Sequence, residues 1–404
     1  MRPINAFPVS YSGKEMVCLQ DTSDLAENTV VIPENIFFIV SMLDGENSVQ
    51  DIQAAYMRRF GDLLFSERIE EVIDELDKNF FIEGERFEAH KEKLKAEFRK
   101  AKTRPFSHQG DTAEDEPARL RSEFRAYYSH PDGPGEVVPD IPSGDVKGIM
   151  LPHIDYMRGG PCYAWGYSCL ERFGDIETFI ILGVNHLSGE SPFAVTSKSF
   201  ETPLGLMDTD RDFVQALIDC SDQDLLEGEF YHRNEHSIEL QTVWLKSLYE
   251  EKDNVKIVPV LCSGFDRFFE KDVSPSQDGM VRDFVGCMKE TISASGKKIC
   301  LMASVDLSHL GPQFGDDRPV SVGDLHDIGH ADLRTLEPVE ALDKEGFWED
   351  VAMDENRRNI CGLSAIYTFL SIMEAREGKL LKYAQWRDEQ GWGCVTFASM
   401  VFCG

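Results

Sequence analysis

Five separate segments of the chain carry histidine, acidic or cysteine residues, the types that bind metal ions and transfer protons. The segments are PHIDY (152–156), VNHLSG (184–189), NEHSIE (234–239), VDLSHLG (305–311) and NICGLS (359–364). Neutral imidazole suits iron, copper and zinc, and a thiolate favours these ions over magnesium. A non-haem metal site is therefore expected if the fold brings the five segments together.

Residue type suggests a role for each side chain in such a site. The expected metal ligands are His153, His186 and Cys361. This set leaves a coordination position for water, substrate or dioxygen. His236 and His309 are the expected supporting or acid–base groups, and Asp306 is expected to orient a histidine. Each residue taken alone is equally compatible with a loop residue bonded to backbone, a helix cap or a core thiol, so only their joint placement favours a site.

The elements that must position these residues alternate between strand-like and helix-like runs. Gly148–Leu151 and Thr178–Val184 are apolar runs typical of buried strands, and Cys162–Phe173 between them has helical spacing. A βαβ unit of this length makes two parallel strands, usually adjacent, whose carboxyl ends lie at one edge of the sheet. Because open α/β sheets bind ligands at that edge, His153 and His186 are expected to share it.

The pattern of runs divides the chain into three parts. Residues 1–88 are expected to form a small winged-helix-like α+β module of three short helices and a hairpin or wing over 80–87. Residues 89–144 are expected to be a linker with helices and a mobile loop over 103–117. Residues 145–404 are expected to form a large α/β domain with a mostly parallel central sheet.

Composition limits the partners and the compartment. The formal net charge is −31, which repels nucleic acid and anionic membranes. The third helix of the small module, SERIEEVIDELDKN, is acidic, which disfavours DNA binding. Docking of a peptide or protein and a purely structural role as a lid on the second domain are both left open. No signal peptide and no membrane-spanning run is present, and the ten cysteines include no CxxC pair. A cytoplasmic protein with free thiols and no structural disulfides is expected.

Several common enzyme classes lack their signatures in this chain. There is no GxGxxG after a strand, no GxxxxGK[ST], no GxSxG and no HExxH. Nicotinamide-dependent, P-loop, serine-hydrolase and zincin chemistry are therefore disfavoured.

The polar segments belong to longer motifs that resemble one protein family. In chain order these motifs are PHIDYMRGGPCYAWGY, FIILGVNHLSG, FETPLGLMDTD, EHSIELQTVWL, IVPVLCSG, ASVDLSHLG and NICGLSAI. They resemble the Memo family, whose bacterial and archaeal members are called AmmeMemoRadiSam system protein B. The resemblance covers residues 145–404, and the N-terminal part resembles a PqqD-like winged-helix module.

The resemblance implies a fold related to class III extradiol (LigB-type) dioxygenases and a set of site residues. The family's ligands, two histidines and a cysteine, fall on His153, His186 and Cys361, and its other pocket residues fall on His236, Asp306 and His309. Leu187 stands where many relatives have a second histidine. Extradiol enzymes use two histidines and a glutamate, so the cysteine argues against ordinary ring cleavage.

Two classes of function follow from the resemblance. The first is a metal-dependent redox enzyme that uses iron (Fe²⁺) or copper and is linked to a radical SAM protein; zinc is a further alternative for the metal of the site. The second is a binding protein without turnover, either a peptide-binding module of the phosphopeptide type or a metallochaperone. The expected ligand is accordingly a small molecule or a peptide.

Overall fold

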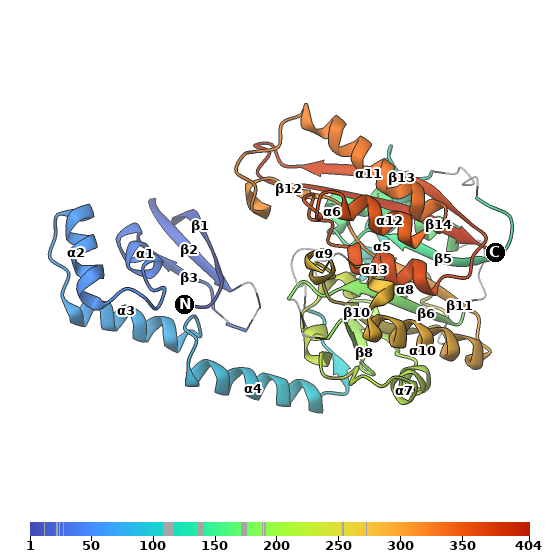
Figure 1. Cartoon of the computed structure of the whole chain (residues 1–404), viewed down its shortest axis with the longest axis horizontal. Helices are drawn as coiled ribbons and strands as arrows, with labels where there is room; N and C mark the ends of the chain where they lie inside the picture. The colour runs from blue at the N-terminus through green and yellow to red at the C-terminus, as the bar shows by residue number, and fades with distance from the viewer. Residues whose placement is uncertain are drawn as a thin grey trace. The chain divides into compact units, whose positions relative to one another are not determined.

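The computed structural model describes residues 1–404 except 12, 22, 24, 27, 108–116, 136–140, 171–175, 188, 190, 253 and 272. The described residues form two compact units, 1–100 and 101–404 (Figure 1). The boundary lies at the end of helix α4 (Glu85–Lys100). Residues 89–100 are therefore part of a helix of the first unit.

The first unit combines a three-stranded antiparallel sheet with four helices. Its elements are β1 (Ile4–Tyr11), β2 (Lys14–Asp21), β3 (Val30–Ile32), α1 (Glu34–Ser41), α2 (Val49–Phe60), α3 (Ser66–Lys78) and α4. Helix α2 begins directly after Ser48, because Ser48 and Asp51 form a reciprocal capping box. Buried Leu19, Ile39 and Ile69 join the sheet to the helices in one core.

The wing expected over residues 80–87 is wrong. Phe80 has a φ of 65°, Phe81 is fully buried, and α4 begins at Glu85, so this segment is a tight turn between two helices. The sheet lies at the start of the unit, where β1 pairs with β2 along residues 4–21. Most side chains of β1 are exposed, so the strand lacks the alternation of buried apolar and exposed polar residues from which a strand is predicted.

The second unit is built on an eight-stranded mixed sheet. In spatial order its strands are β12 (His309–Leu310), β14 (Cys394–Cys403), β5 (Val146–Leu151), β11 (Ile299–Ser304), β6 (Thr178–Val184), β10 (Lys256–Cys262) and β7 (Phe193–Val195), with β13 (Glu377–Arg387) also paired to β14. The central strands β5, β11, β6 and β10 are parallel, and the outer pairings are antiparallel. The α/β class is confirmed.

Strands β5 and β6 are parallel but not neighbours. Strand β11 lies between them and pairs with both, so the expected adjacency of the opening βαβ unit is wrong. Three carboxyl ends rather than two therefore meet at this part of the edge. The third belongs to β11, and Asp306 follows it by two residues.

Helices cover both faces of the sheet. They are α5 (Pro117–Ser129), α6 (Tyr156–Leu170), α7 (Arg211–Cys220), α8 (His236–Leu248), α9 (Arg267–Glu270), α10 (Gly279–Ser295), α11 (Asp324–Glu340), α12 (Lys344–Ala352) and α13 (Leu363–Ile372). Phe179 and Ile181 of β6 pack with α5, α6 and α8, whereas Ile180 and Leu182 pack with α7, α10, α12 and α13. None of the helices in the described parts of the chain is both long and apolar enough to cross a bilayer.

Part of the loop expected over residues 103–117 is regular and buried. Thr103–Arg104 forms β4, which pairs with β8 (Ser199–Thr202) in a small sheet completed by β9 (Gly205–Met207). The Arg104 side chain is fully buried and forms an ion pair with Glu239 of α8. Residues 108–116 of that expected loop lie outside the described residues.

The expectation that all cysteines are free is also wrong. Cys220 at the end of α7 and Cys287 in α10 form a disulfide. The two residues are 67 positions apart, and only the packing of α7 against α10 brings them together. No short cysteine spacing in the sequence could have predicted this pair.

Candidate metal centre

The histidine, cysteine and acidic residues singled out in the sequence gather at the carboxyl edge of the central parallel strands. His153 follows β5 by two residues, His186 follows β6 by two, and Asp306 follows β11 by two. His236 is the first residue of α8, and Cys361 lies two residues before α13. The expected common edge is therefore present.

Three imidazoles form the centre of this group. The ring centroids of His153 and His186 are 5.1 Å apart, those of His153 and His236 5.2 Å, and those of His186 and His236 4.7 Å. One ring nitrogen of each lies within 4.8 Å of the others. His236, expected as a supporting group, is thus placed as a potential ligand beside the two expected histidines.

His153 is held in one tautomer. Its Nδ1 lies 2.9 Å from the carbonyl oxygen of Ser304, which can only accept, so Nδ1 carries the proton and Nε2 has the free lone pair. The backbone N–H of His153 donates to Asp306 Oδ1 at 3.0 Å. Burial lowers the pKa of His153 to about 3, so the ring is neutral at pH 7. A fixed neutral imidazole of this kind is a ready metal ligand.

Glu235 orients the other two imidazoles. Its carboxylate accepts from His186 Nδ1 at 3.0 Å and lies 3.3 Å from His236 Nδ1. It also accepts from the backbone N–H of His186 and Ser237 at 3.2 and 2.9 Å. The Nε2 atoms are thereby left to face outward from the carboxylate. The sequence places Glu235 directly before His236 at a helix start, but residue type alone assigned it no role.

Glu235 also makes the site attractive to a positive charge. Burial is the largest single influence on the pKa of Glu235 and raises it, but His186, His236 and the N–H group of Ser237 together lower that pKa well below its usual value. Burial likewise lowers the pKa of His186, but Glu235 and Cys361 together raise that pKa well above its usual value. The buried carboxylate therefore favours a proton or a metal cation on the imidazole beside it.

Cys361 reaches the histidines because Gly362 follows it. The Cys361 Sγ lies 3.3 Å from His153 Nε2 and 3.6 Å from the carbonyl oxygen of Asp306. A Cβ on Gly362 would stand 2.6 Å from Val305 and 2.8 Å from that carbonyl, so only glycine allows this approach. Burial raises the pKa of the Cys361 thiol, against a hydrogen bond with His186 that lowers it.

Asp306 and His309 lie beside the imidazoles rather than among them. The Asp306 Oδ2 is 3.7 Å from His153 Nε2, and burial raises the pKa of Asp306 to about 6. His309 Nδ1 donates to the carbonyl oxygen of Leu307 at 3.0 Å, and its ring meets the ring of Phe314 edge-on at 5.0 Å. Burial lowers the pKa of His309, although the charge of Asp306 opposes that shift.

A second buried network fixes the loops that carry these groups. Asp332 of α11 accepts hydrogen bonds from Ser308, Arg358, Tyr383 and Thr396 at 2.5–2.8 Å. Ser308 lies between Asp306 and His309, and the carbonyl oxygen of Arg358 accepts from the His309 backbone N–H at 2.7 Å. The segments 305–310 and 356–362 are thus joined to one aspartate.

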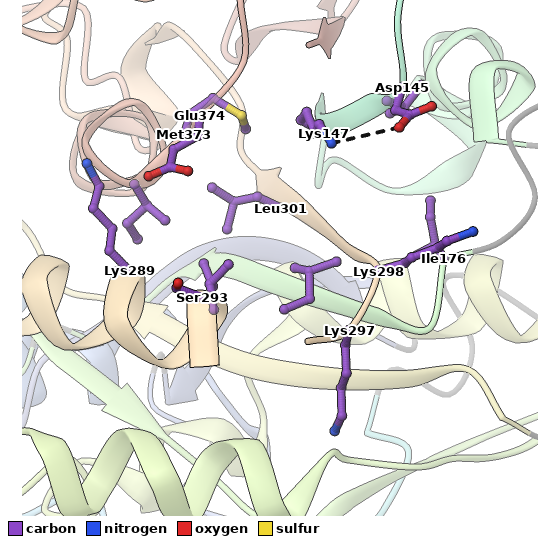
Figure 2. A pocket seen from close by; sticks show the side chains of 14 residues that line it. Asp145, Lys147, Ile176, Lys289, Ser293, Lys297, Lys298, Leu301, Met373 and Glu374 are labelled. Atoms are coloured by element: carbon purple, nitrogen blue, oxygen red, sulfur yellow. Dashed lines mark ion pairs between the residues drawn. The ribbon is translucent and has the colours of Figure 1, made fainter. Parts of the chain in front are cut away.

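A pocket of about 370 Å³ opens onto the group. His186, His309 and Cys361 contribute polar atoms to its wall, and Val184, Phe265, Phe314, Ile360 and Leu363 contribute apolar surface. A larger cavity of about 660 Å³ lies at the opposite edge of the sheet (Figure 2). Its lining has no histidine or cysteine, and its polar groups are mainly lysines, with Lys147 3.9 Å from Asp145. The smaller pocket is therefore the one whose wall carries side chains that can bind a metal ion or transfer protons.

The described residues fit a transition-metal ion. His153 and His186 each have Nδ1 bonded to an acceptor, which leaves Nε2 for an ion. The imidazole of His236 and the thiol of Cys361 lie close by, and the buried carboxylate of Glu235 supplies negative charge. The donor set is nitrogen and sulfur, as iron, copper and zinc prefer.

Comparison with known proteins identifies the family. The sequence profile described as Memo-like protein matches residues 104–401. A MEMO1 family protein of Aquifex aeolicus is 28% identical over 406 residues and covers 100% of both chains. A MEMO1 family protein of Methanopyrus kandleri is 30% identical over 299 residues, which are 71% of this chain and 94% of that one. Because the profile matches nearly all of the second unit, the chain belongs to the Memo family.

Proposed function

We propose that the chain is a metal-dependent redox enzyme that binds iron, with copper as the alternative, and acts on a small molecule in the 370 Å³ pocket. The observation that carries the proposal is the anchoring of His153. Its Nδ1 is fixed on Ser304, and its Nε2 faces the Cys361 sulfur at 3.3 Å. His153 and His186 would hold the ion, with Cys361 or His236 as the third ligand.

The surrounding residues have separate tasks in this proposal. Bound iron or copper would supply one-electron chemistry toward dioxygen or another oxidant, as in the extradiol dioxygenases that the family resembles. Glu235 holds the imidazoles of His186 and His236 in orientation. Asp306 and His309 hold or move protons beside the pocket, and the apolar wall of Phe265, Phe314 and Leu363 excludes water from a bound molecule.

Metal content is the direct test. Protein purified without metal-affinity resin should carry near-stoichiometric iron or copper, and His186→Ala should lose it, whereas His130→Ala, at an exposed histidine outside the site, should not. Cys361→Ala and His236→Ala compared side by side identify the third ligand. Protein that stays metal-free after anaerobic purification and incubation with Fe²⁺ would refute the proposal.

The first unit favours a second candidate function, docking of a peptide or of a radical SAM protein. A cavity of about 580 Å³ lies between β3, α1 and α3, with Ile32, Ile36 and Val72 among its apolar lining. Strand β3 pairs only with β2 in the described sheet, so its other side is an edge that an extended peptide could extend. If the candidate metal centre does not catalyse a reaction, the chain would instead be a peptide-binding module or a metallochaperone.

Co-purification tests this docking role in the full chain. A co-expressed radical SAM enzyme should be captured by the wild-type chain and lost with Ile36→Asp. Phe7→Asp, at an exposed apolar residue on the opposite edge strand, is the matched control and should retain capture. Equal capture by all three proteins would exclude this surface.

A further inference from the structure

Helix α11, labelled in Figure 1, carries two further histidines, which are not among those gathered at the sheet edge. His326 and His330 are four residues apart and both are exposed. Residues at this spacing lie one above the other on the same helix face. Their Nε2 atoms are 3.2 Å apart, and their ring centroids 4.4 Å. The two nitrogens thus already face each other across one turn.

This separation suits a shared cation. Two nitrogens that each lie about 2.0–2.1 Å from one zinc ion at a tetrahedral angle are about 3.3 Å apart. Two histidines at i and i+4 of a helix are the arrangement by which known zinc sites present two ligands from one element. The Nδ1 of His326 lies 3.5 Å from the Asp327 carboxylate, an acceptor that favours the proton on Nδ1 and the lone pair on Nε2.

The helix holds this pair on a fixed base. Ile328 and Asp332 are buried beneath it, and Asp332 is bonded to four side chains of the domain. The amide of Gln385 in β13 donates to the carbonyl oxygen of Leu325 at 3.0 Å. Because the backbone of the first turns is fixed, a cation would have to order only the two side chains.

We propose that His326 and His330 form a second metal site that takes a divalent transition cation such as Zn²⁺, Ni²⁺ or Cu²⁺, with water or an external ligand in the remaining positions. Imidazole nitrogen selects these ions over Mg²⁺ and Ca²⁺. The site is independent of the centre at the sheet edge and does not require that centre to bind metal.

Zinc binding to the full chain tests the proposal. Equilibrium dialysis of wild-type protein against Zn²⁺ should reveal an equivalent that His330→Ala or His326→Ala weakens at least tenfold. His186→Ala should leave that equivalent in place, and so should His130→Ala. Because His326, His330 and His130 are exposed, thermal unfolding without metal should be the same for these three variants and the wild type.

A spacing control separates chelation from histidine content. The double variant His330→Ala/Leu333→His keeps two exposed histidines on α11 but sets them seven residues, about 10.5 Å, apart along the helix. It should bind no better than His330→Ala. In His186→Ala, electron paramagnetic resonance of one Cu²⁺ equivalent should show coupling to two nitrogens that disappears with His330→Ala. Zinc and copper binding unchanged in His326→Ala and His330→Ala would overturn the proposal.

Discussion

Two buried carboxylates, Glu235 and Asp332, show how similar chemistry produces two different outcomes in this fold. Each is at most 7% exposed and accepts several hydrogen bonds. The partners of Asp332 are a guanidinium and three hydroxyls, all of which belong to the packed frame. The side-chain partners of Glu235 are two imidazoles whose other nitrogens face a third imidazole.

The two carboxylates differ in whether the side chains bonded to them have further atoms available to bind an ion. Arg358 neutralises Asp332 and is itself bonded to Thr335 at 2.7 Å, so among the described residues the partners of Asp332 offer no metal-binding nitrogen. An imidazole bonded through Nδ1 still has Nε2 available, so the network of Glu235 ends at atoms that can coordinate an ion. A buried carboxylate thus indicates a site only when its partners remain open.

The strongest test of this contrast is Asp332→Asn. The amide keeps the shape but leaves the Arg358 guanidinium buried without its main counter-charge, and Asp350 at 3.7 Å compensates only in part. We expect the free energy of unfolding of the second unit to fall by about 3 kcal/mol. Urea denaturation followed by tryptophan fluorescence measures this unit alone, since all five tryptophans lie beyond residue 100. A loss below 1 kcal/mol would show that the network is not a structural frame.

The next largest effect should come from Glu235→Gln and should appear in metal affinity. The amide oxygen can still accept one hydrogen bond, but the negative charge beside His186 and His236 is lost. Loss of an orienting carboxylate typically weakens metal binding about 10–100-fold. Competition with a chelator measures the change. Glu229→Gln, which alters a carboxylate paired with Lys198 outside the site, is the control and should keep wild-type affinity.

A third buried carboxylate, Asp21 in the first unit, should make the stability of that unit depend on pH. Burial alone would raise its pKa, but the N–H groups of Ala26 and Ser23 and the Arg2 guanidinium outweigh burial and lower the pKa from 3.8. A lowered folded-state pKa means that this stabilisation is present above pH 4 and is lost as the pH falls further. Asp21→Asn should cost about 1.5 kcal/mol at pH 7 and should flatten the acid dependence.

Amide hydrogen exchange, measured in peptides from residues 1–43, reports the stability of the first unit separately from that of the second. In the wild type, exchange should accelerate as the pH drops below 4, after correction for the intrinsic rate. In Asp21→Asn it should be faster at pH 7 and change less with acid. The same acid dependence in both proteins would assign the effect to other groups.

The smallest effect is expected at the exposed ion pair of Arg121 and Glu250. Their side chains are 30% and 41% exposed, so water and salt screen the pair. Glu250→Gln should leave the urea midpoint of the second unit within experimental error. A shift as large as that of Asp332→Asn would contradict the distinction between buried and exposed carboxylates.

The sequence was sufficient to place the principal site residues because position in an α/β sheet follows from local pattern. His153 and His186 each follow an apolar run, and the carboxyl ends of parallel strands share one edge. The role of Glu235 was not predictable, because its meaning depends on the direction of its carboxylate toward His186. Residue type also suggested a supporting role for His236, whereas the fold sets its ring beside the other two.

The failures have a common physical cause, since each depends on contacts between residues far apart in the chain. The place of β11 between β5 and β6 is decided by pairing over more than 100 residues. The Cys220–Cys287 disulfide depends on two helices meeting. Strand β1 is specified by its pairing with β2 rather than by its own largely exposed side chains. Local periodicity contains none of this information.

The middle position of β11 also has a consequence for how the protein is made. His153 and His186 emerge early in synthesis, but the strand that separates them and the carbonyl that fixes His153 arrive only with residues 299–304. Cys361 follows later still, and β14 completes the pairing of β5 at the end of the chain. A nascent chain therefore displays these imidazoles long before the complete group of side chains exists, so an ion bound there would be acquired only when translation is nearly complete.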